Sequence, residues 1–501
     1  MEEFKDKKKM DDLPFQSAVN LVKAIQEKKI SSSELLELYI ERYERYNPSI
    51  NAIVETDFET ARAKARQADE ALANNENWGP LHGLPMTIKD YINVTGLHTT
   101  YGSPIFKDNL PTTNSDVVQP LIDAGAIIFG KTNLPLWAMG TQSFNEVYGQ
   151  TNNPWDLTRT SGGSSGGSAA AIAAGLSGLE IGSDHAGSIR SPAHFCGIYG
   201  HKPTYGIVPI HGQQPPKKIE LIDYSPEQDF TVTGPLARSA ADLDLVMDLA
   251  VRPPVFQRKA IKINLPTPRK KALKDYRIGV WIEDPLYSPD TEVGECLERL
   301  VVDLLKKGTK IDEKKPDFNF HRSVDVFYEL MQLANVAYMS EEEFNSLRKK
   351  SNELDTGDQS IDAWYARVLT KTHREWQLLN YERLMIRQKW ADYFKKYDVL
   401  LCPAVRIAAF PHDHSMGIGS LQRISTKFGN QDVTHGNVMT PWATLASLSY
   451  LPASIAPIGL TSDGLPAGVQ IIGPYLEDRT TIHFAKLIEE NYFGFQPPPG
   501  F

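Results

Sequence analysis

The sequence predicts an α/β fold in which both halves of the chain contribute strands to one sheet. From Leu84 onward, short apolar strands alternate with helices, a pattern that is typical of α/β folds. After residue 397, three further apolar segments have the character of strands separated by turn residues: YDVLLCPAV, SIAPIGL and GVQIIGP. No internal repeat or low-complexity segment interrupts this pattern. We therefore expect strands from distant parts of the sequence to meet in one sheet.

The first predicted elements are helices. Residues 16–46 carry apolar side chains at three- and four-residue spacing, which predicts two amphipathic helices, and the segment SSSE supplies an N-cap for the second. A third helix is predicted over residues 57–74. The segments PMTIKDY, VVQPLIDAG and AIIFGK then begin the alternation of strands and helices. A charged, largely helical section at 290–395 separates them from the last strands and resembles an insertion.

Composition and charge exclude several classes of protein. The 501 residues are 41% hydrophobic, which is enough for a sizeable core, and 53 Lys and Arg face 62 Asp and Glu, for a net charge of −9. Because the charges are interspersed, we expect no nucleic-acid surface. No apolar signal segment follows MEEFKDKKKM, and the longest weakly polar stretch falls short of the roughly 20 residues that span a bilayer. The expectation is a cytoplasmic chain with no membrane span.

Cysteine and histidine spacing gives no metal signature. Cys196, Cys296 and Cys402 show neither pairing nor ligand spacing, which predicts free, buried thiols in a reducing compartment. His412 and His414 lie close together, but without a third ligand at a fixed offset a solvated loop is favoured. We therefore predict no metal site.

Residues 125–132, GAIIFGKT, match the phosphate-loop pattern G-x-x-x-x-G-K-[ST]. Such a loop needs a flexible turn across the x positions, but here they form an apolar, β-branched run that is itself typical of a strand. Pro135 follows Lys131 by four residues and obstructs the helix that the motif requires. A P-loop nucleotide-binding protein is therefore kept only as the last alternative.

A second motif, G-x-S-x-G centred on Ser165, lies within SGGSSGGS. An α/β-hydrolase elbow requires a buried strand before the first Gly, whereas NNPWDLTRT precedes this one, and no clear Asp and His partners follow. The Gly residues allow close approach of the backbone, and an Ala-rich helix follows at once. From this pattern alone, a loop that caps the helix remains an alternative to a catalytic segment.

The sequence around this segment closely resembles that of one protein family. Residues 162–204 read GGSSGGSAAAIAAGLSGLEIGSDHAGSIRSPAHFCGIYGHKPT. Four other segments add to the likeness: LPMTIKDYINVTG, AIIFGKTNLPLWAMG, TVTGPLARSAADL and GLPAGVQIIGP. Together they resemble the amidase signature family of serine hydrolases, over about half of the chain. In that context GAIIFGKT is the strand and turn leading to TNLP.

The resemblance implies a catalytic triad. The family's Ser-cisSer-Lys triad falls on Ser188 of AGSIR, Ser164 of GGSSGG and Lys89 of TIKD, with a cis peptide bond between Gly163 and Ser164. Ser188 would attack an amide carbonyl, Ser164 would relay the proton, and Lys89 would accept it and return it to the leaving nitrogen. For this role, the pKa of Lys89 must fall from about 10.4 towards about 7 or 8, which burial would achieve.

The family's oxyanion hole consists of backbone N–H groups, which here belong to His185, Ala186, Gly187 and Ser188. This chain reads D-H-A-G-S where D-T-G-G-S is commoner, so an imidazole is expected beside the site. The resemblance implies that this departure affects substrate preference and not the mechanism. Three neighbours are predicted to be structural, two by supporting the loop and the third by capping the Ala-rich helix: Ser165, Arg190 and Ser168.

The resemblance also implies the architecture, an α/β/α sandwich whose central twisted mixed sheet is covered by helices on both faces. We expect one domain over residues 1–501, with N-terminal helices at about 16–75, a catalytic core at about 76–255 and 396–501, and a variable, largely helical insert at about 256–395. The family implies no metal and no organic cofactor.

Variable segments around the pocket set substrate choice in such enzymes. Apolar candidates for the lining are Trp137, Met139, Phe144, Met439 and Trp442. We therefore predict an amidase that hydrolyses the C–N bond of apolar or aryl carboxylic amides, with esters and carbamates as further substrates, and that works as a monomer or homodimer on a small-molecule amide. The alternative is the glutaminase subunit of a tRNA-dependent amidotransferase, against which the Pro-rich segment GQQPPKKIELIDYSPEQ argues.

Overall fold

The computed structural model describes residues 12–213, 228–336, 339–355, 357–414 and 420–501. Its centre is a mixed sheet of eleven strands. In chain order these strands are β1 (Ile53–Thr56), β2 (Pro85–Lys89), β3 (Ile127–Thr132), β8 (Glu180–Asp184), β9 (Tyr199–Lys202), β10 (Val232–Ala237), β11 (Arg277–Val280), β12 (Lys310–Asp312), β13 (Val399–Pro403), β16 (Ala453–Leu460) and β17 (Pro466–Ile472). Across the sheet their order is β1-β3-β2-β8-β10-β9-β16-β17-β13-β11-β12.

Strands from the two halves of the chain meet in the middle of this sheet, as predicted. Strand β9 pairs with β10 on one side and, through Ser454 opposite His201, with β16 on the other. Strand β2 lies between β3 and β8 and is parallel to both, with Ile88 opposite Ile181 of β8. Because parallel strands end at the same edge, the last residues of β2 and β8 lie side by side.

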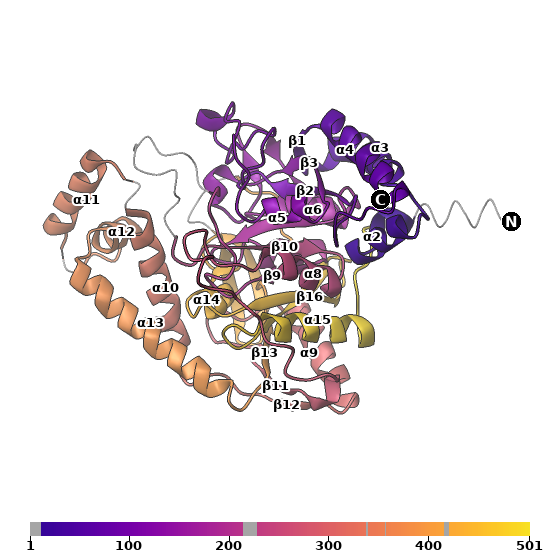
Figure 1. The fold of residues 1–501 in the computed structure, drawn as a ribbon. Coiled ribbons are helices and arrows are strands. Elements are labelled where there is room, and N and C mark those ends of the chain that lie inside the picture. Colours follow the sequence, from indigo (N-terminus) through magenta and orange to yellow (C-terminus); the bar gives the residue numbers. More distant parts are fainter. Residues whose placement is uncertain (1–11, 214–227, 337–338, 356, 415–419) are drawn as a thin grey trace.

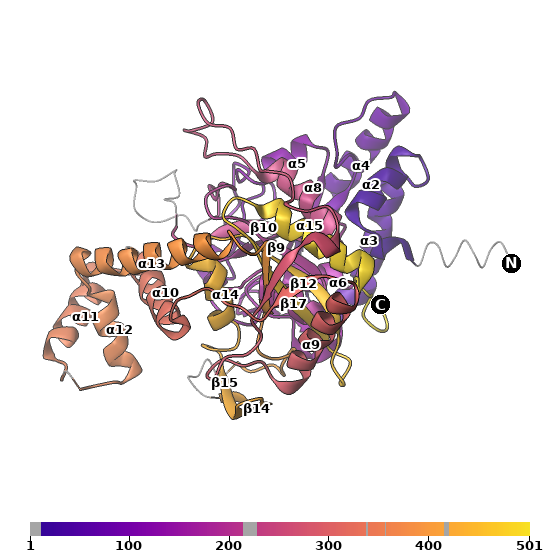
Figure 2. The same cartoon turned by 90° about the horizontal axis from the view of Figure 1, so that it is seen from below.

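Helices cover both faces of the sheet (Figures 1 and 2). Helices α8 (Ala240–Ala250) and α15 (Asp478–Asn491) pack together on one face, and α6 (Gly166–Ala173) and α7 (Arg190–Cys196) lie on the other. All eight residues of α6 are buried, which explains its Ala-rich sequence, since a helix enclosed on every side has room only for small side chains. This arrangement confirms the predicted α/β/α sandwich.

The N-terminal helices follow the predicted pattern. Helices α2 (Ala18–Gln26) and α3 (Ser32–Ile50) cover the first predicted range, and α4 (Phe58–Ala73) covers the next. Ser31 caps α3 through a capping box, in which its side chain accepts from the backbone N–H of Glu34 and the Glu34 carboxylate accepts in return.

The predicted insert at 256–395 differs from the structure. Its last part forms an arm of four helices, α10 (Phe320–Asn335), α11 (Glu341–Glu353), α12 (Ile361–Leu369) and α13 (His373–Tyr393), which projects from the body of the molecule in Figure 1. Residues 277–312 instead contribute the strands β11 and β12, which extend the sheet by parallel pairing from β13. Helix α9 (Thr291–Lys306) connects these two strands. The Pro-rich segment that argued against the glutaminase subunit lies largely in 214–227, outside the described residues.

Shorter elements complete the described chain. They are η1 (Leu13–Phe15), η2 (Pro104–Phe106), α5 (Gln119–Asp123), η3 (Leu136–Ala138), β4 (Phe144–Asn145), β5 (Gly149–Gln150), β6 (Asn152–Asn153), β7 (Asp156–Thr160), η4 (Leu273–Asp275), β14 (Ser420–Thr426), β15 (Gly429–Thr434) and α14 (Thr440–Ser447). All three cysteines are free and buried, as predicted. Within the described ranges, no helix is long and apolar enough to cross a membrane.

The segment that matches the phosphate-loop pattern is a strand. Gly130, Lys131 and Thr132 are the last residues of β3, so no helix begins at the lysine. The Lys131 ammonium is fully buried and donates to the Ile92 carbonyl and the Thr99 hydroxyl, each at 2.7 Å. A lysine held in this way cannot reach a phosphate group, which excludes the phosphate-loop hypothesis.

Candidate active site

Lys89 lies at the carboxyl end of β2, beside the end of β8. Its side chain is fully buried, and its Nζ donates to three hydroxyl groups: Ser164 at 2.6 Å, Ser183 at 2.9 Å and Ser165 at 3.0 Å. None of the described carboxylates forms an ion pair with it. A lysine without a counter-ion in such a place is arranged to be an uncharged amine.

The electrostatic environment of Lys89 supports this state. Burial lowers the pKa of Lys89 to about 7, although the nearby charges of Asp184 and Glu180 act in the opposite direction. An amine with this pKa is largely neutral slightly above pH 7 and is matched to general-base chemistry near neutral pH.

The loop that carries Ser164 precedes α6. Its Gly163–Ser164 peptide bond is cis, as the family resemblance implied. The next residue, Ser165, ties the loop to its surroundings: its backbone N–H donates to the Ser188 carbonyl at 3.1 Å and its hydroxyl donates to the Ser183 carbonyl at 3.2 Å. These bonds confirm the structural role predicted for Ser165. By contrast, Ser168 lies inside α6 and bonds to Thr132 and Glu180, so the prediction that it caps this helix is wrong.

Ser188 lies between β8 and α7, beside the loop that carries Ser164. It is 7% exposed, and its hydroxyl makes no hydrogen bond to another described residue. The structure therefore brings Lys89 and Ser164 into direct contact and places Ser188 beside their loop, while the hydrogen bond from Ser188 to Ser164 that a proton relay requires is not formed.

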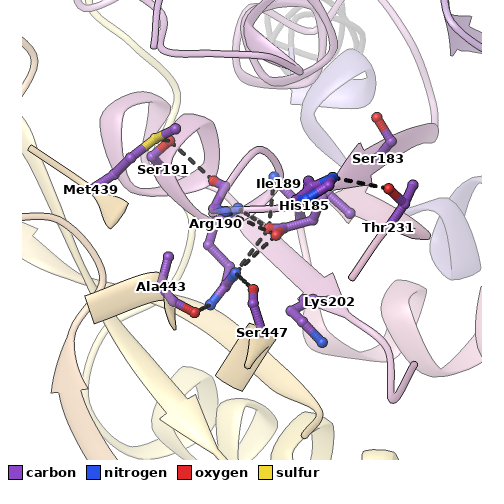
Figure 3. Close-up of polar contacts among 12 residues, drawn as sticks. Ser183, His185, Ile189, Arg190, Ser191, Lys202, Thr231, Met439, Ala443 and Ser447 are labelled. Atoms are coloured by element: carbon purple, nitrogen blue, oxygen red, sulfur yellow. Dashed lines mark hydrogen bonds and ion pairs between the residues drawn. The ribbon is translucent and has the colours of Figure 1, made fainter. Parts of the chain in front are cut away.

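The loop between β8 and α7 is anchored by the Asp184–Arg190 ion pair. The guanidinium of Arg190 donates to both carboxylate oxygens of Asp184, at 2.8 and 3.0 Å, and to Gln470. It also donates to Ala443 and Ser447, as Figure 3 shows. Although burial alone would raise the pKa of Asp184, the charge of Arg190 and its hydrogen bonds hold that pKa well below the usual range. The loop-supporting role predicted for Arg190 is thus confirmed by its contacts.

We expect the Arg190→Leu variant to lose about 3 to 5 kcal/mol of unfolding free energy, because the Asp184 carboxylate would remain buried without its partner. Urea unfolding monitored by circular dichroism measures this loss. The Lys395→Leu variant is the control, since its ion pair with Asp392 is exposed and screened by solvent, so its loss is expected to change stability little. Equal losses in the two variants would contradict the anchoring role.

The predicted oxyanion hole needs one correction. The backbone N–H of Gly187 donates to Asp184 Oδ1 at 2.9 Å, so it is not available to a substrate oxygen. The backbone N–H groups of His185, Ala186 and Ser188 make no hydrogen bond to other described residues. These three remain as candidate donors. The imidazole of His185, a residue of this loop, packs against Phe230 and Phe327. Burial lowers the pKa of His185 to about 4, so the ring is neutral near pH 7.

The five predicted pocket residues differ in burial and surroundings. Met439 lies at the site, because its sulfur accepts a hydrogen bond from the Ser191 hydroxyl at 2.9 Å and a Cβ on Gly187 would contact it at 3.7 Å. Trp442 belongs to the core instead: it is fully buried, and its Nε1 donates to a backbone carbonyl. The other three occupy partly or largely exposed positions: Trp137, Met139 and Phe144. The residues that follow Met139 lie against the loop that carries Ser164, since a Cβ on Gly163 would meet the Gly140 carbonyl at 2.5 Å.

Two site residues were not predicted from the sequence, although both lie in the segment, residues 162–204, that carried the family resemblance. Ser183 bonds to Lys89, and Asp184 fixes the loop that contains Ser188. Their place immediately before the predicted oxyanion residues was the available signal. A third, Thr231, bonds to His185 from forty-six residues further along the chain. It is the first residue of TVTGPLARSAADL, which also carried the resemblance but gave no indication of this contact.

A model of the Amidase family matches residues 34–482 of the chain. The chain belongs to the amidase signature family. It is therefore an enzyme of the kind that hydrolyses carbon–nitrogen bonds of amides other than peptide bonds. Among the described residues of this amidase, no group of His, Cys, Asp or Glu side chains has the arrangement of a metal site.

The amidase is similar to curated relatives over almost its whole length. The A subunit of the Glutamyl-tRNA(Gln) amidotransferase of Saccharolobus solfataricus is 31% identical over 500 residues, covering 94% of this chain and 96% of the relative. The protein of the same name from Thermosynechococcus vestitus is 32% identical over 496 residues, covering 94% and 97%. Among solved structures, a bacterial aryl acylamidase superposes with a TM-score of 0.78 at 23% identity, covering 97% of this chain and 99% of the other.

These relatives overturn one prediction. Each is named as one subunit of a larger enzyme, and that name includes a charged tRNA. The prediction of a monomer or homodimer that acts on a small-molecule amide and has no nucleic-acid partner is therefore wrong. It relied on interspersed surface charge, and a catalytic subunit does not need a basic surface if another part of its enzyme holds the nucleic acid.

Proposed function

We propose that the amidase cleaves the C–N bond of its substrate through an acyl-enzyme on Ser188, with Ser164 as proton relay and Lys89 as general base. The observation that carries this proposal is the buried Lys89 amine, which contacts hydroxyl groups and none of the carboxylates that the structure describes. Such an amine can take a proton from Ser164 while Ser164 takes the proton of Ser188.

Protons and bonds balance in each step of this reaction. As the Ser188 oxygen bonds to the carbonyl carbon, its proton passes to Ser164 and the Ser164 proton passes to Lys89. The oxyanion is stabilised by the backbone N–H groups of the loop. Collapse of this intermediate breaks the C–N bond, while the proton returns through Ser164 to the leaving nitrogen. Water then attacks the acyl ester by the same route, releases the carboxylic acid and restores Ser188.

For the substrate, we propose the side-chain amide of glutamine, hydrolysed by this chain as the glutaminase subunit of a tRNA-dependent amidotransferase. The support is the likeness to the A subunits of such enzymes, which extends over nearly the full length of both chains. Ammonia is then the product that the remainder of such an enzyme would consume.

A second candidate substrate is an aryl amide. It is favoured by the apolar side chain of Met439, which lies against Gly187 of the loop. An apolar side chain at this place suits a flat acyl or aryl group.

Release of ammonia from L-glutamine and of aniline from an anilide distinguishes the two substrates. We expect glutamine to be hydrolysed by the purified chain, to a greater extent once partner subunits are added, and the Ser188→Ala variant to release no ammonia above background. Turnover of the anilide with no turnover of glutamine, with or without partner subunits, would favour the aryl amide. Hydrolysis of either substrate that persists in Ser188→Ala would contradict the mechanism itself.

A further inference from the structure

The two halves of the loop that carries the candidate oxyanion donors are held by different kinds of contact. The carboxylate of Asp184 accepts from the backbone N–H groups of Gly187, Ile189 and Arg190, which fixes the second half of the loop. The backbone N–H groups of His185 and Ala186, in the first half, bond to no other described residue. The position of this half therefore depends on side-chain contacts.

The main polar contact of the first half is the hydrogen bond between His185 Nδ1 and Thr231 Oγ1, at 3.0 Å (Figure 3). The single hydroxyl hydrogen of Thr231 is directed to Gln228 Oε1, at 3.1 Å, so Thr231 accepts from His185 and the imidazole carries its hydrogen on Nδ1. The other ring nitrogen, Nε2, is buried and has no partner among the described residues. Thr231 thus fixes both the ring and its tautomer.

The segment that carries Thr231 is in turn fixed to the helical arm. Its neighbour Asp229 accepts from Arg383 of α13 at 2.7 Å and from the hydroxyl of Tyr450 at 2.5 Å. The Arg383 side chain is only 7% exposed. Phe327 of α10 packs against the imidazole of His185. His185 therefore lies where the oxyanion loop meets the arm.

We propose that His185 is a positioning residue. Its hydrogen bond to Thr231 links the oxyanion loop to the segment that is fixed to the helical arm, and this link holds the backbone N–H groups of His185 and Ala186 in place in the oxyanion hole. This inference rests on the proposed function, because these groups matter only if Ser188 forms a tetrahedral intermediate. Loss of one oxyanion donor typically lowers kcat by about 10² to 10³, and a displacement of about 1 Å has an effect of about 10².

The test uses Thr231→Val and His185→Phe, which remove the acceptor and the donor of this bond and keep the size or the aromatic ring of the side chain. We expect each to lower kcat by about 10- to 100-fold with little change in KM or melting temperature, because the ground state does not depend on the oxyanion donors. Thr231→Ser keeps the hydroxyl and is expected to retain parental kcat. The control is Thr233→Val, which removes another buried hydroxyl of the same segment, one that bonds to Gln213.

Two further measurements separate positioning from general damage. Because the two residues act through one bond, the double variant is expected to lose no more kcat than either single variant. Nitrogen-15 NMR of labelled histidine in the full chain is expected to show hydrogen on Nδ1 of His185 in the parent and to lose this signature in Thr231→Val.

Parental kcat in Thr231→Val, or equal effects of Thr231→Val and Thr233→Val on kcat, KM and melting temperature, would overturn the inference. Additive losses in the double variant would also overturn it. A parent that hydrolyses no amide refutes the proposed function instead, and the NMR result then still shows whether the hydrogen bond exists.

Discussion

Replacement of Ser188 by Ala is expected to lower kcat by about 10⁵-fold or more and to abolish formation of the acyl-enzyme. Without the hydroxyl oxygen, no covalent intermediate forms, and water would have to attack the amide unaided. Mass spectrometry of the intact chain after treatment with a sulfonyl fluoride measures this directly. We expect one label per chain in the parent and none in Ser188→Ala, with an unchanged melting temperature.

The Ser165→Ala variant is the matched control, since Ser165 is the centre of the competing G-x-S-x-G motif and also contacts Lys89. Its hydroxyl supports the loop, so we expect slower labelling but the same final extent. If Ser165→Ala is not labelled while Ser188→Ala is, the triad assignment fails and the elbow motif carries the chemistry.

Replacement of Lys89 by Arg is expected to lower the rate of amide hydrolysis by about 10² to 10⁴, the range typical of a general base. A guanidinium remains protonated at any working pH and cannot accept the proton from Ser164. Single-turnover acylation with an amide and an ester of the same acyl group measures the loss. The amide is expected to suffer more, because its poor leaving group needs the returned proton. Near-parental amide turnover by Lys89→Arg would show that the residue supplies only charge.

The Lys89→Met variant covers the case in which Arg does not fit the buried site, since Met has a similar length and carries no charge. It is expected to lose activity to a similar degree while its melting temperature stays at or above the parental value, because no amine remains to be desolvated.

The pH dependence of the parent gives an independent test of Lys89. Burial lowers its pKa to about 7, and only the neutral amine can accept a proton. The value of kcat/KM is therefore expected to rise with pH through about 7 and then to level off, and this limb should be absent from the residual activity of Lys89→Met. A profile that stays flat between pH 5 and 9 in the parent would contradict the general-base role.

The oxyanion loop of this amidase is anchored at two places, which its sequence motif alone does not show. Asp184 and Arg190 hold one half of the loop from within the core, and His185 and Thr231 hold the other half against the arm. A ligand or partner that shifts the arm would therefore act on the transition state more than on substrate binding.

Much of the fold was predictable from local sequence. The apolar spacing of residues 16–46 predicted α2 and α3, and the apolar runs after residue 397 predicted β13, β16 and β17. Periodicity did not predict β12, because three residues at a sheet edge, none of them buried, carry no alternating pattern. That β11 and β12 join the sheet was missed for a second reason: strand pairing is a long-range contact that a short segment does not encode.

Contiguous segments of sequence were sufficient to predict the family and the fold class, and to propose roles for Lys89, Ser164 and Ser188. The folded chain was needed to show which backbone N–H groups of the loop already have a partner. The N–H of Gly187 donates to Asp184, Thr231 contacts His185, and Arg383 contacts Asp229. The partners in the last two pairs lie far apart along the chain and meet only when the sheet and the arm have assembled. A hydrogen bond of this kind depends on the final packing of several elements, and no local pattern specifies it.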